Sequence, residues 1–133
     1  MPIEAYMQSL FDRVAAAPAV ATSDIALDKR GPQAGLIRGD VYFADDSLLH
    51  FRELVDLELN PPRLMYSDHY QRADATLVFR YDDTPHYPDL PGFPHHKHTN
   101  AEANVSAVTP PDLAAVLDEI ERLLLDSGDQ STG

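Results

Sequence analysis

Apolar residues follow two different periods along the chain. Near the N-terminus, Ile3, Met7, Leu10 and Val14 form one stripe at helical spacing, and Pro2 suits the first turn of a helix. Further along, the period changes to two over five runs that turn-forming residues separate. These runs cover residues 23–30, 35–43, 47–59, 63–71 and 75–83. The pattern predicts an N-terminal helix followed by five strands.

The clearest element is a helix near the end of the chain. Thr109 is followed by Pro110, with Asp112 three positions after it, which predicts a helix start with Thr109 as the N-cap. The apolar stripe of this helix consists of Leu113, Val116, Leu117, Ile120, Leu123 and Leu124. Gly128 predicts its end, and we expect residues 127–133 to form a disordered tail. The chain is therefore predicted to fold as one α+β domain over residues 1–126. In this domain a five-stranded antiparallel meander carries both helices on one face, with a long loop rich in proline and histidine.

Alternation along the strands predicts which side chains face away from the helices. Arg38 and Arg52 point away from the apolar faces of their own strands. A two-residue turn at Ala73–Asp74 would place His69 one diagonal step from Arg80. The same register pairs Ser67 with Arg80, Tyr66 with Tyr81, Asp68 with Phe79 and Tyr70 with Leu77. We therefore expect three arginines and a histidine on the uncovered face of the sheet.

Composition and charge narrow the classes of function. The formal net charge of −12 disfavours sequence-independent binding to duplex DNA. Eight of the ten lysines and arginines lie within residues 24–104, however, so a local cationic patch is compatible with this charge. The absence of cysteine excludes disulfides, thiolate zinc sites and cysteine nucleophiles. No apolar run approaches the roughly 18 residues of a membrane span, and the start lacks the pattern of a signal peptide. We expect a cytoplasmic protein without membrane contact.

Residues 80–100, RYDDTPHYPDLPGFPHHKHTN, concentrate the candidate chemistry. They hold four of the six histidines and four of the eleven prolines in one irregular connection, and such connections usually serve a function. His96 and His98, two positions apart, could ligate zinc or nickel. Alternatively, a histidine could act as general acid or base while Lys97 and Arg80 stabilise phosphoryl charge, as in metal-independent ribonucleases. Third, the prolines could simply fix a rigid path, and the residues by themselves favour this structural interpretation.

Three tracts resemble the TumE family of small toxin–antitoxin proteins: HYQ at 69–71, LVFRYDDTPHYPDLPGFPHHKH at 77–98 and PPDLAAVLDEI at 110–120. The positions that match the family's signature are Arg80, Tyr81, Asp82, Pro85, His86, Leu90, Phe93, Pro94, His95, His96, Lys97 and His98. Asp83 and Tyr87 depart from it. The resemblance covers roughly residues 20–120 and implies a growth-inhibiting toxin paired with a small DNA-binding antitoxin.

Residues and resemblance together give a hypothesis about function. We predict a toxin that acts on RNA, as a metal-independent ribonuclease or as another RNA-acting growth inhibitor, with no cofactor and no bound metal. The expected catalytic residues are His69, Arg80, His95, His96 and His98, and the expected RNA contacts are Lys97, Arg38, Arg52 and Tyr81. Expected partners are a cognate antitoxin and RNA, with a second copy of the chain as a further candidate. The alternative is a non-enzymatic accessory module that uses the His-Lys loop to grip a protein or a nucleic acid.

Overall fold

The computed structural model describes residues 1–131, and side chains over residues 1–126. It contains two helices, α1 (Ile3–Ala16) and α2 (Leu113–Ser131), and seven strands between them. The strands are β1 (Val20–Gly31), β2 (Ala34–Phe43), β3 (Leu48–Asp56), β4 (Arg63–Gln71), β5 (Leu77–Asp82), β6 (His96–Thr99) and β7 (Ala101–Ala107).

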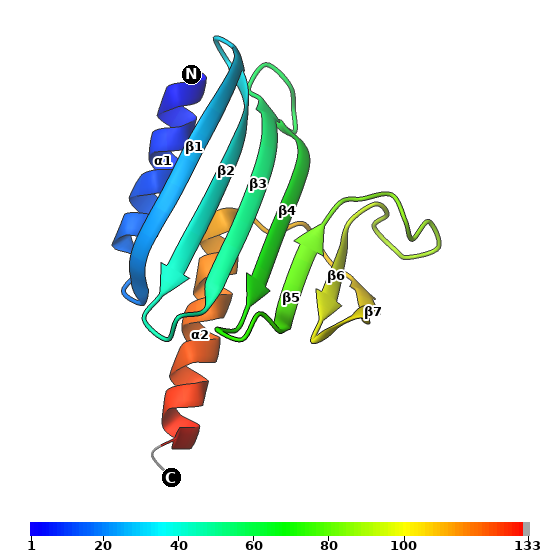
Figure 1. The fold of residues 1–133 in the computed structure, drawn as a ribbon. Helices are drawn as coiled ribbons and strands as arrows, with labels where there is room; N and C mark the ends of the chain where they lie inside the picture. The colour runs from blue at the N-terminus through cyan, green and yellow to red at the C-terminus, as the bar shows by residue number, and fades with distance from the viewer. Residues whose placement is uncertain (132–133) are drawn as a thin grey trace.

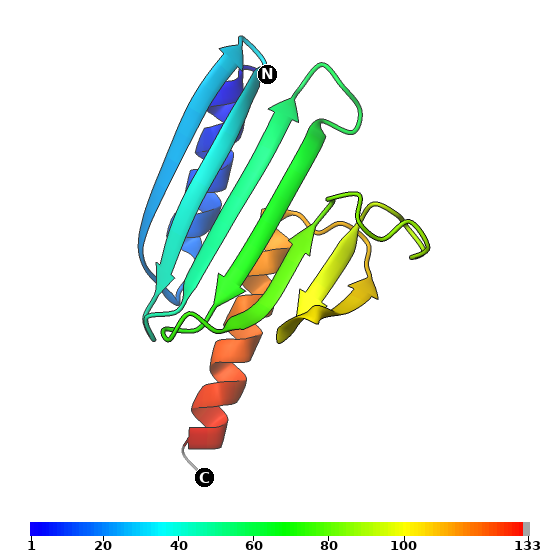
Figure 2. The ribbon, with the colours of Figure 1, turned by 45° about the vertical axis from the view of Figure 1, so that its right-hand side comes forward.

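The strands form one open antiparallel sheet in the order β1-β2-β3-β4-β5-β6-β7, which is a meander. Both helices lie on the same face of this sheet, α1 behind β1 and β2 and α2 behind the middle strands (Figure 1). A rotated view shows the opposite face without a covering element (Figure 2). We refer to these two sides as the helix face and the open face. The predicted α+β class and the placement of the helices are confirmed.

The hydrophobic core fills the space between the sheet and the two helices. Its largest fully buried side chains include Phe43, Phe51 and Phe79 from the strands. The helices contribute the predicted stripes, of which Ile3 and Ile120 are fully buried. Because alternate strand residues point to one face, this core leaves the remaining side chains of each strand on the open face. The open face is therefore free to carry polar groups.

The prediction of five strands is wrong, because the end of the proline-rich segment returns to the sheet. After the irregular residues 83–95, β6 pairs with β5, and β7 pairs with β6. Asn100, with a φ of 64°, makes the tight connection between these two strands. The apolar alternation that marks other strands is missing from HKHT, so only the fold itself reveals this strand.

The predicted register of the β4–β5 hairpin is also wrong. Residues 72–76 form the connection: the Arg72 N–H donates to the Thr76 carbonyl, and Ala75 has a φ of 70°. The longer turn shifts the pairing by two residues, so His69 lies directly opposite Arg80 rather than diagonal to it. Because a shift of two preserves the alternation, the side chains from Phe79 to Asp82 remain on their predicted faces. An irregularity at Gln71 disturbs the turn end of the hairpin, where Leu77 pairs with Gln71 and Val78 packs against the core.

Helix α2 begins later and ends later than its sequence predicts. The Asp112 side chain accepts a hydrogen bond from the Ala115 N–H at 2.8 Å, and its carbonyl accepts one from the Val116 N–H. Asp112 is therefore the N-cap, in place of Thr109. The helix continues through Gly128 to Ser131, so its predicted end is wrong. Residues 132–133 of the predicted tail lie outside the described residues.

Candidate functional site

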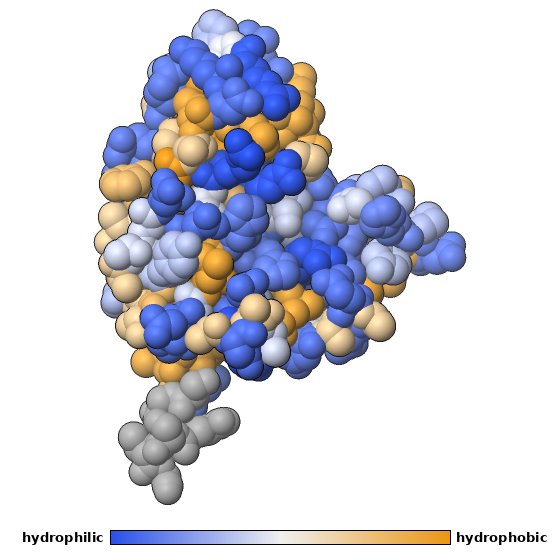
Figure 3. All heavy atoms as spheres, viewed as in Figure 1, coloured by the Kyte–Doolittle hydropathy of each residue, from blue (hydrophilic) through white to orange (hydrophobic). Residues whose placement is uncertain are grey.

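Strand register brings ten open-face side chains into two adjacent rows that cross five strands. One row consists of Arg38, Arg52, Ser67, Asp82 and His96. The other consists of Asp40, His50, His69, Arg80 and His98. Figure 3 views this face and shows hydrophilic side chains over its centre. Residues from five separate segments of the chain therefore share one polar surface.

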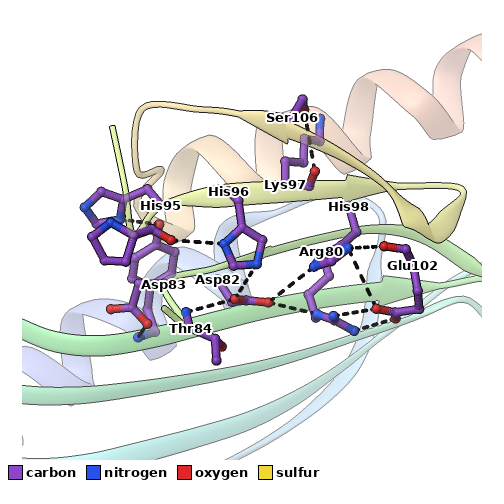
Figure 4. A network of polar contacts seen from close by, with 12 residues as sticks. Arg80, Asp82, Asp83, Thr84, His95, His96, Lys97, His98, Glu102 and Ser106 are labelled. Atoms are coloured by element: carbon purple, nitrogen blue, oxygen red, sulfur yellow. Dashed lines mark hydrogen bonds and ion pairs between the residues drawn. The ribbon is translucent and has the colours of Figure 1, made fainter. Parts of the chain in front are cut away.

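A buried cluster of Asp82, His96 and His98 lies at the β5–β6 end of these rows (Figure 4). Nε2 of His96 lies 2.8 Å from Oδ1 of Asp82, and Nε2 of His98 lies 4.0 Å from Oδ2. Each imidazole turns its Nδ1 to a backbone carbonyl: His96 to Pro94 at 3.0 Å and His98 to Glu102 at 2.7 Å. Both rings are thus fixed with Nε2 toward the same carboxylate.

Asp82 is held in its ionised form by its neighbours. Burial by itself would raise its pKa, but the backbone N–H of Thr84 and the guanidinium of Arg80 both donate to the carboxylate. Their combined effect holds the pKa of Asp82 below its usual value. The cluster therefore keeps a negative charge in a buried position, which is retained only where partners compensate for it.

Arg80 is fixed between two carboxylates. Its Nε donates to Asp82 at 2.9 Å, and its two terminal nitrogens donate to Glu102 at 2.6 Å each, a bidentate arrangement. The hydrogen bonds to Glu102 are the main reason that the pKa of Arg80 is raised. Glu102 is 62% exposed, so an anionic ligand could displace its carboxylate from the guanidinium.

A cavity of about 400 Å³ opens above this cluster. Arg52 and Ser67 line it from the sheet, and Thr84, His86 and Tyr87 line it from the irregular segment after β5. The ring of Tyr87 also packs edge-on against His96, with centroids 4.9 Å apart. The proline-rich segment therefore forms one wall of the cavity, and the sheet forms its floor.

His69 continues the second row beside Arg80. Burial, followed by the positive charge of Arg80, lowers the pKa of His69 below its usual value. A histidine of this kind is neutral at neutral pH and can accept a proton. The predicted grouping of His69, Arg80, His96 and His98 on one surface is thus present in the structure.

Three other predicted site residues lie elsewhere. Lys97 points to the helix face, where its Nζ donates to Glu119 at 2.7 Å, and the Tyr81 hydroxyl donates to the same carboxylate. His95 stacks on Tyr66, and its Nδ1 lies 2.9 Å from that hydroxyl. Adjacent strand residues point to opposite faces, which separates Lys97 from the histidines on either side of it. Lys97 and Tyr81 therefore lie on the opposite face of the sheet from His96 and His98, contrary to the prediction, whereas His95 lies beside Tyr66, a residue that lines the cavity.

Two members of the site were not predicted as such. Asp82 lies two positions after Arg80 in RYD and hence on the same face, which alternation along β5 indicates. Glu102 lies on β7, a strand that no apolar pattern marks. Pairing of β6 with β5 sets His96 opposite Asp82, and β7 follows as the next strand beside β6.

The fold and this cluster define a small α+β protein that carries arginine, imidazole and carboxylate groups on an uncovered sheet face. The family model described as Toxin TumE matches residues 9–126, so the chain belongs to the TumE family. This membership confirms the resemblance seen in the sequence and indicates a toxin role with a cognate antitoxin as partner. No curated protein and no solved structure gives a significant match. Within the described residues, neither helix has the length and apolar character needed to cross a bilayer.

Proposed function

We propose that this toxin acts on RNA as an endoribonuclease and that the open face is its substrate-binding surface. The observation that carries the proposal is the row His69–Arg80–His98, in which a guanidinium lies between two imidazoles. Neighbouring strands are about 4.8 Å apart, so the backbones of His69 and His98 are about 10 Å apart. A phosphodiester held over Arg80 would have His69 on one side and the Asp82–His96–His98 cluster on the other.

The roles follow from the chemistry of RNA cleavage. His69, with its lowered pKa, accepts the proton of the ribose 2′-hydroxyl. The 2′-oxygen then bonds to phosphorus while the bond from phosphorus to the 5′-oxygen breaks, and the departing 5′-oxygen receives a proton at the cluster. Arg80 stabilises the phosphoryl charge. The products are a 2′,3′-cyclic phosphate and a free 5′-hydroxyl.

Arg38 and Arg52 support an RNA path across the sheet. They are paired with each other across β2 and β3, and both are exposed. Arg52 also lines the cavity. Like charges directly opposite each other destabilise a sheet, so this pair is best explained by an anionic ligand. The two arginines extend from the cavity toward β1, a direction in which a single strand could continue beyond the cleaved phosphate.

The test is expression of the toxin with and without its antitoxin, followed by mapping of RNA ends. We expect growth arrest and RNA fragments that end in 2′,3′-cyclic phosphate. His69→Gln should reduce cleavage by about 10²–10⁴-fold without changing thermal unfolding. Asp118→Asn, exposed on α2 and away from the open face, serves as the control and should remain active. A folded His69→Gln protein with full activity would refute the proposed role of His69. Growth arrest with intact RNA would favour the non-enzymatic interaction module.

A further inference from the structure

The Asp82–His96–His98 cluster has the geometry of a metal site in both its ligand atoms and their supporting contacts. One ligand atom from each residue can be chosen so that all three lie within 4.8 Å of one another. Metal-bound histidines almost always donate their other ring N–H to a carbonyl or carboxylate, which fixes the ring. Here Pro94 and Glu102 supply those carbonyls. The Thr84 N–H and Arg80 fix the carboxylate of Asp82 in the same way.

The supporting contacts aim both imidazoles at one carboxylate. A carbonyl can only accept a hydrogen bond, so Pro94 and Glu102 each pair with the Nδ1–H of a ring and leave Nε2 as the ring atom that faces Asp82 (Figure 4). Nε2 of His96 lies 2.8 Å from Oδ1 of Asp82, whereas Nε2 of His98 lies 4.0 Å from Oδ2, beyond hydrogen-bond distance. One divalent cation would be a ligand partner for all three groups.

Distances agree with a small cation of tetrahedral preference. Bonds of about 2.0–2.1 Å place tetrahedral ligand atoms about 3.3 Å apart. The distances from the two Nε2 atoms to their nearer carboxylate oxygens of Asp82, 2.8 Å to Oδ1 and 4.0 Å to Oδ2, lie on either side of that value. Imidazole and carboxylate ligands suit zinc and its neighbours better than magnesium, which prefers oxygen alone. The cavity of about 400 Å³ adjoins the cluster, so a fourth position stays open to water or substrate, as in catalytic rather than structural zinc sites.

We infer that Asp82, His96 and His98 bind one divalent transition-metal ion of the zinc type, with its open position toward the cavity. This inference deepens the proposed function, because a water on the cation is then the proton donor for the departing 5′-oxygen and becomes hydroxide in that step. It replaces the metal-free account that the sequence favoured. In sequence the ligands lie at positions 82, 96 and 98, a spacing that matches no zinc signature, and pairing of β5 with β6 brings them together.

The experiment measures zinc binding to the purified full-length protein, stripped with chelator, in the absence of RNA. Calorimetric titration with Zn²⁺ should show one site per chain, and Co²⁺ should give the visible absorption of a four-coordinate site. Asp82→Asn keeps the shape of the side chain and its contact with the Thr84 N–H, yet removes the anionic ligand. Together with His98→Gln, it should weaken Zn²⁺ binding by at least about 100-fold, beyond the loss typical of outer-shell partners.

His50→Gln is the control, because His50 pairs with Asp40 on the same face outside the cluster, and it should bind Zn²⁺ as the wild type does. Circular dichroism establishes that each variant is folded. No zinc bound at one equivalent, or unchanged affinity in both folded cluster variants, would overturn the inference. The two proposals fail separately. Stoichiometric zinc without RNA cleavage would refute only the ribonuclease, whereas cleavage by a protein that binds no zinc would refute only the metal site.

Discussion

Asp68 allows a quantitative test of the core, because it is a carboxyl buried without a compensating partner. It is 1% exposed on the helix face, and its Oδ2 has no hydrogen-bond partner among the described residues. Burial, and then the nearby charge of Glu53, raises the pKa of Asp68 to about 8, although Arg63 acts in the opposite direction. At neutral pH the folded protein therefore holds a proton on Asp68 that the unfolded chain releases.

The size of the effect follows from proton linkage. An unfolded aspartate has a pKa of about 3.9, so between about pH 4 and pH 8 the native state binds one more proton than the unfolded state. Stability then falls with rising pH by about 1.4 kcal/mol per unit, and the loss ends above the folded pKa. At pH 7 the accumulated loss is about 4 kcal/mol. Asp68→Asn keeps the shape, stays neutral and avoids this loss, so it should stabilise the protein at pH 7 by up to about 4 kcal/mol.

Urea unfolding of the wild type and Asp68→Asn at pH 5, 6, 7 and 8 measures this difference. The advantage of Asn should grow by about 1.4 kcal/mol per pH unit across the series. Asp118→Asn, exposed on α2, is the control and should show no comparable trend. If Asp68→Asn is less stable than the wild type at pH 7, or if its advantage does not change with pH, then Asp68 is ionised and held by Arg63, and the reasoning fails.

Two further predictions concern the close packing of the sheet and the arginine pair on its open face. A Cβ at Gly39 would lie 2.3 Å from the ring of Phe51. Gly39→Ala should therefore lower the free energy of unfolding, measured in urea, by about 1–3 kcal/mol. An unchanged free energy of unfolding would mean that the ring moves freely. Replacement of Arg38 and Arg52 together by Gln should reduce the slope of log affinity for single-stranded RNA against log salt concentration by about 1.4. The control Arg30→Gln, at an exposed position, should leave this slope nearly unchanged. A double variant with the same slope as the wild type would exclude a phosphate path over β2 and β3.

Hydrophobic alternation predicted the sheet as far as β5, because those strands bury one face against the helices. The bounds of β4, Arg63–Gln71, agree with the predicted run 63–71. The open-face placement of Arg38, Arg52, His69 and Arg80 also follows from alternation alone, and a register error of two residues does not disturb it. This part of the site was therefore predictable.

The remaining part of the site depends on β6 and β7, which no apolar pattern marks. In β6 the buried positions on the open face are His96 and His98, so its alternation is one of histidines. Most of β7 is exposed, as expected for a short edge strand, and its composition resembles a loop. These strands form because the backbone of β6 pairs with the edge of the sheet at β5, and β7 pairs with β6. Since β5 is distant in sequence, the local sequence of β6 and β7 does not reveal this pairing. The cluster with Asp82 and Glu102 could not be predicted without it.

The HHKH motif contributes to both faces of the sheet. His96 and His98 belong to the candidate site on the open face, whereas Lys97 lies on the helix face. Its Nζ lies between β6 and α2, paired with Glu119 at side-chain exposures of 20% and 21%, and 4.8 Å from the centre of the Tyr81 ring. Burial, the largest influence, lowers the pKa of Lys97, but the interactions with Glu119 and Tyr81 together outweigh burial and raise the pKa of Lys97. Loss of such a half-buried pair should cost about 1–2 kcal/mol, between the values for exposed and buried pairs.

Lys97→Met should therefore lower the urea midpoint while zinc binding and toxicity per folded molecule remain, because its side chain points away from the cavity. His98→Gln should instead abolish zinc binding and toxicity in the folded protein, since His98 lines the cavity. The two variants are compared in the same unfolding and growth assays. The comparison tests whether HHKH holds the sheet to α2 through Lys97 on the helix face and forms the site through His98 on the open face. A folded Lys97→Met protein that is no longer toxic would place Lys97 in the site and contradict this division.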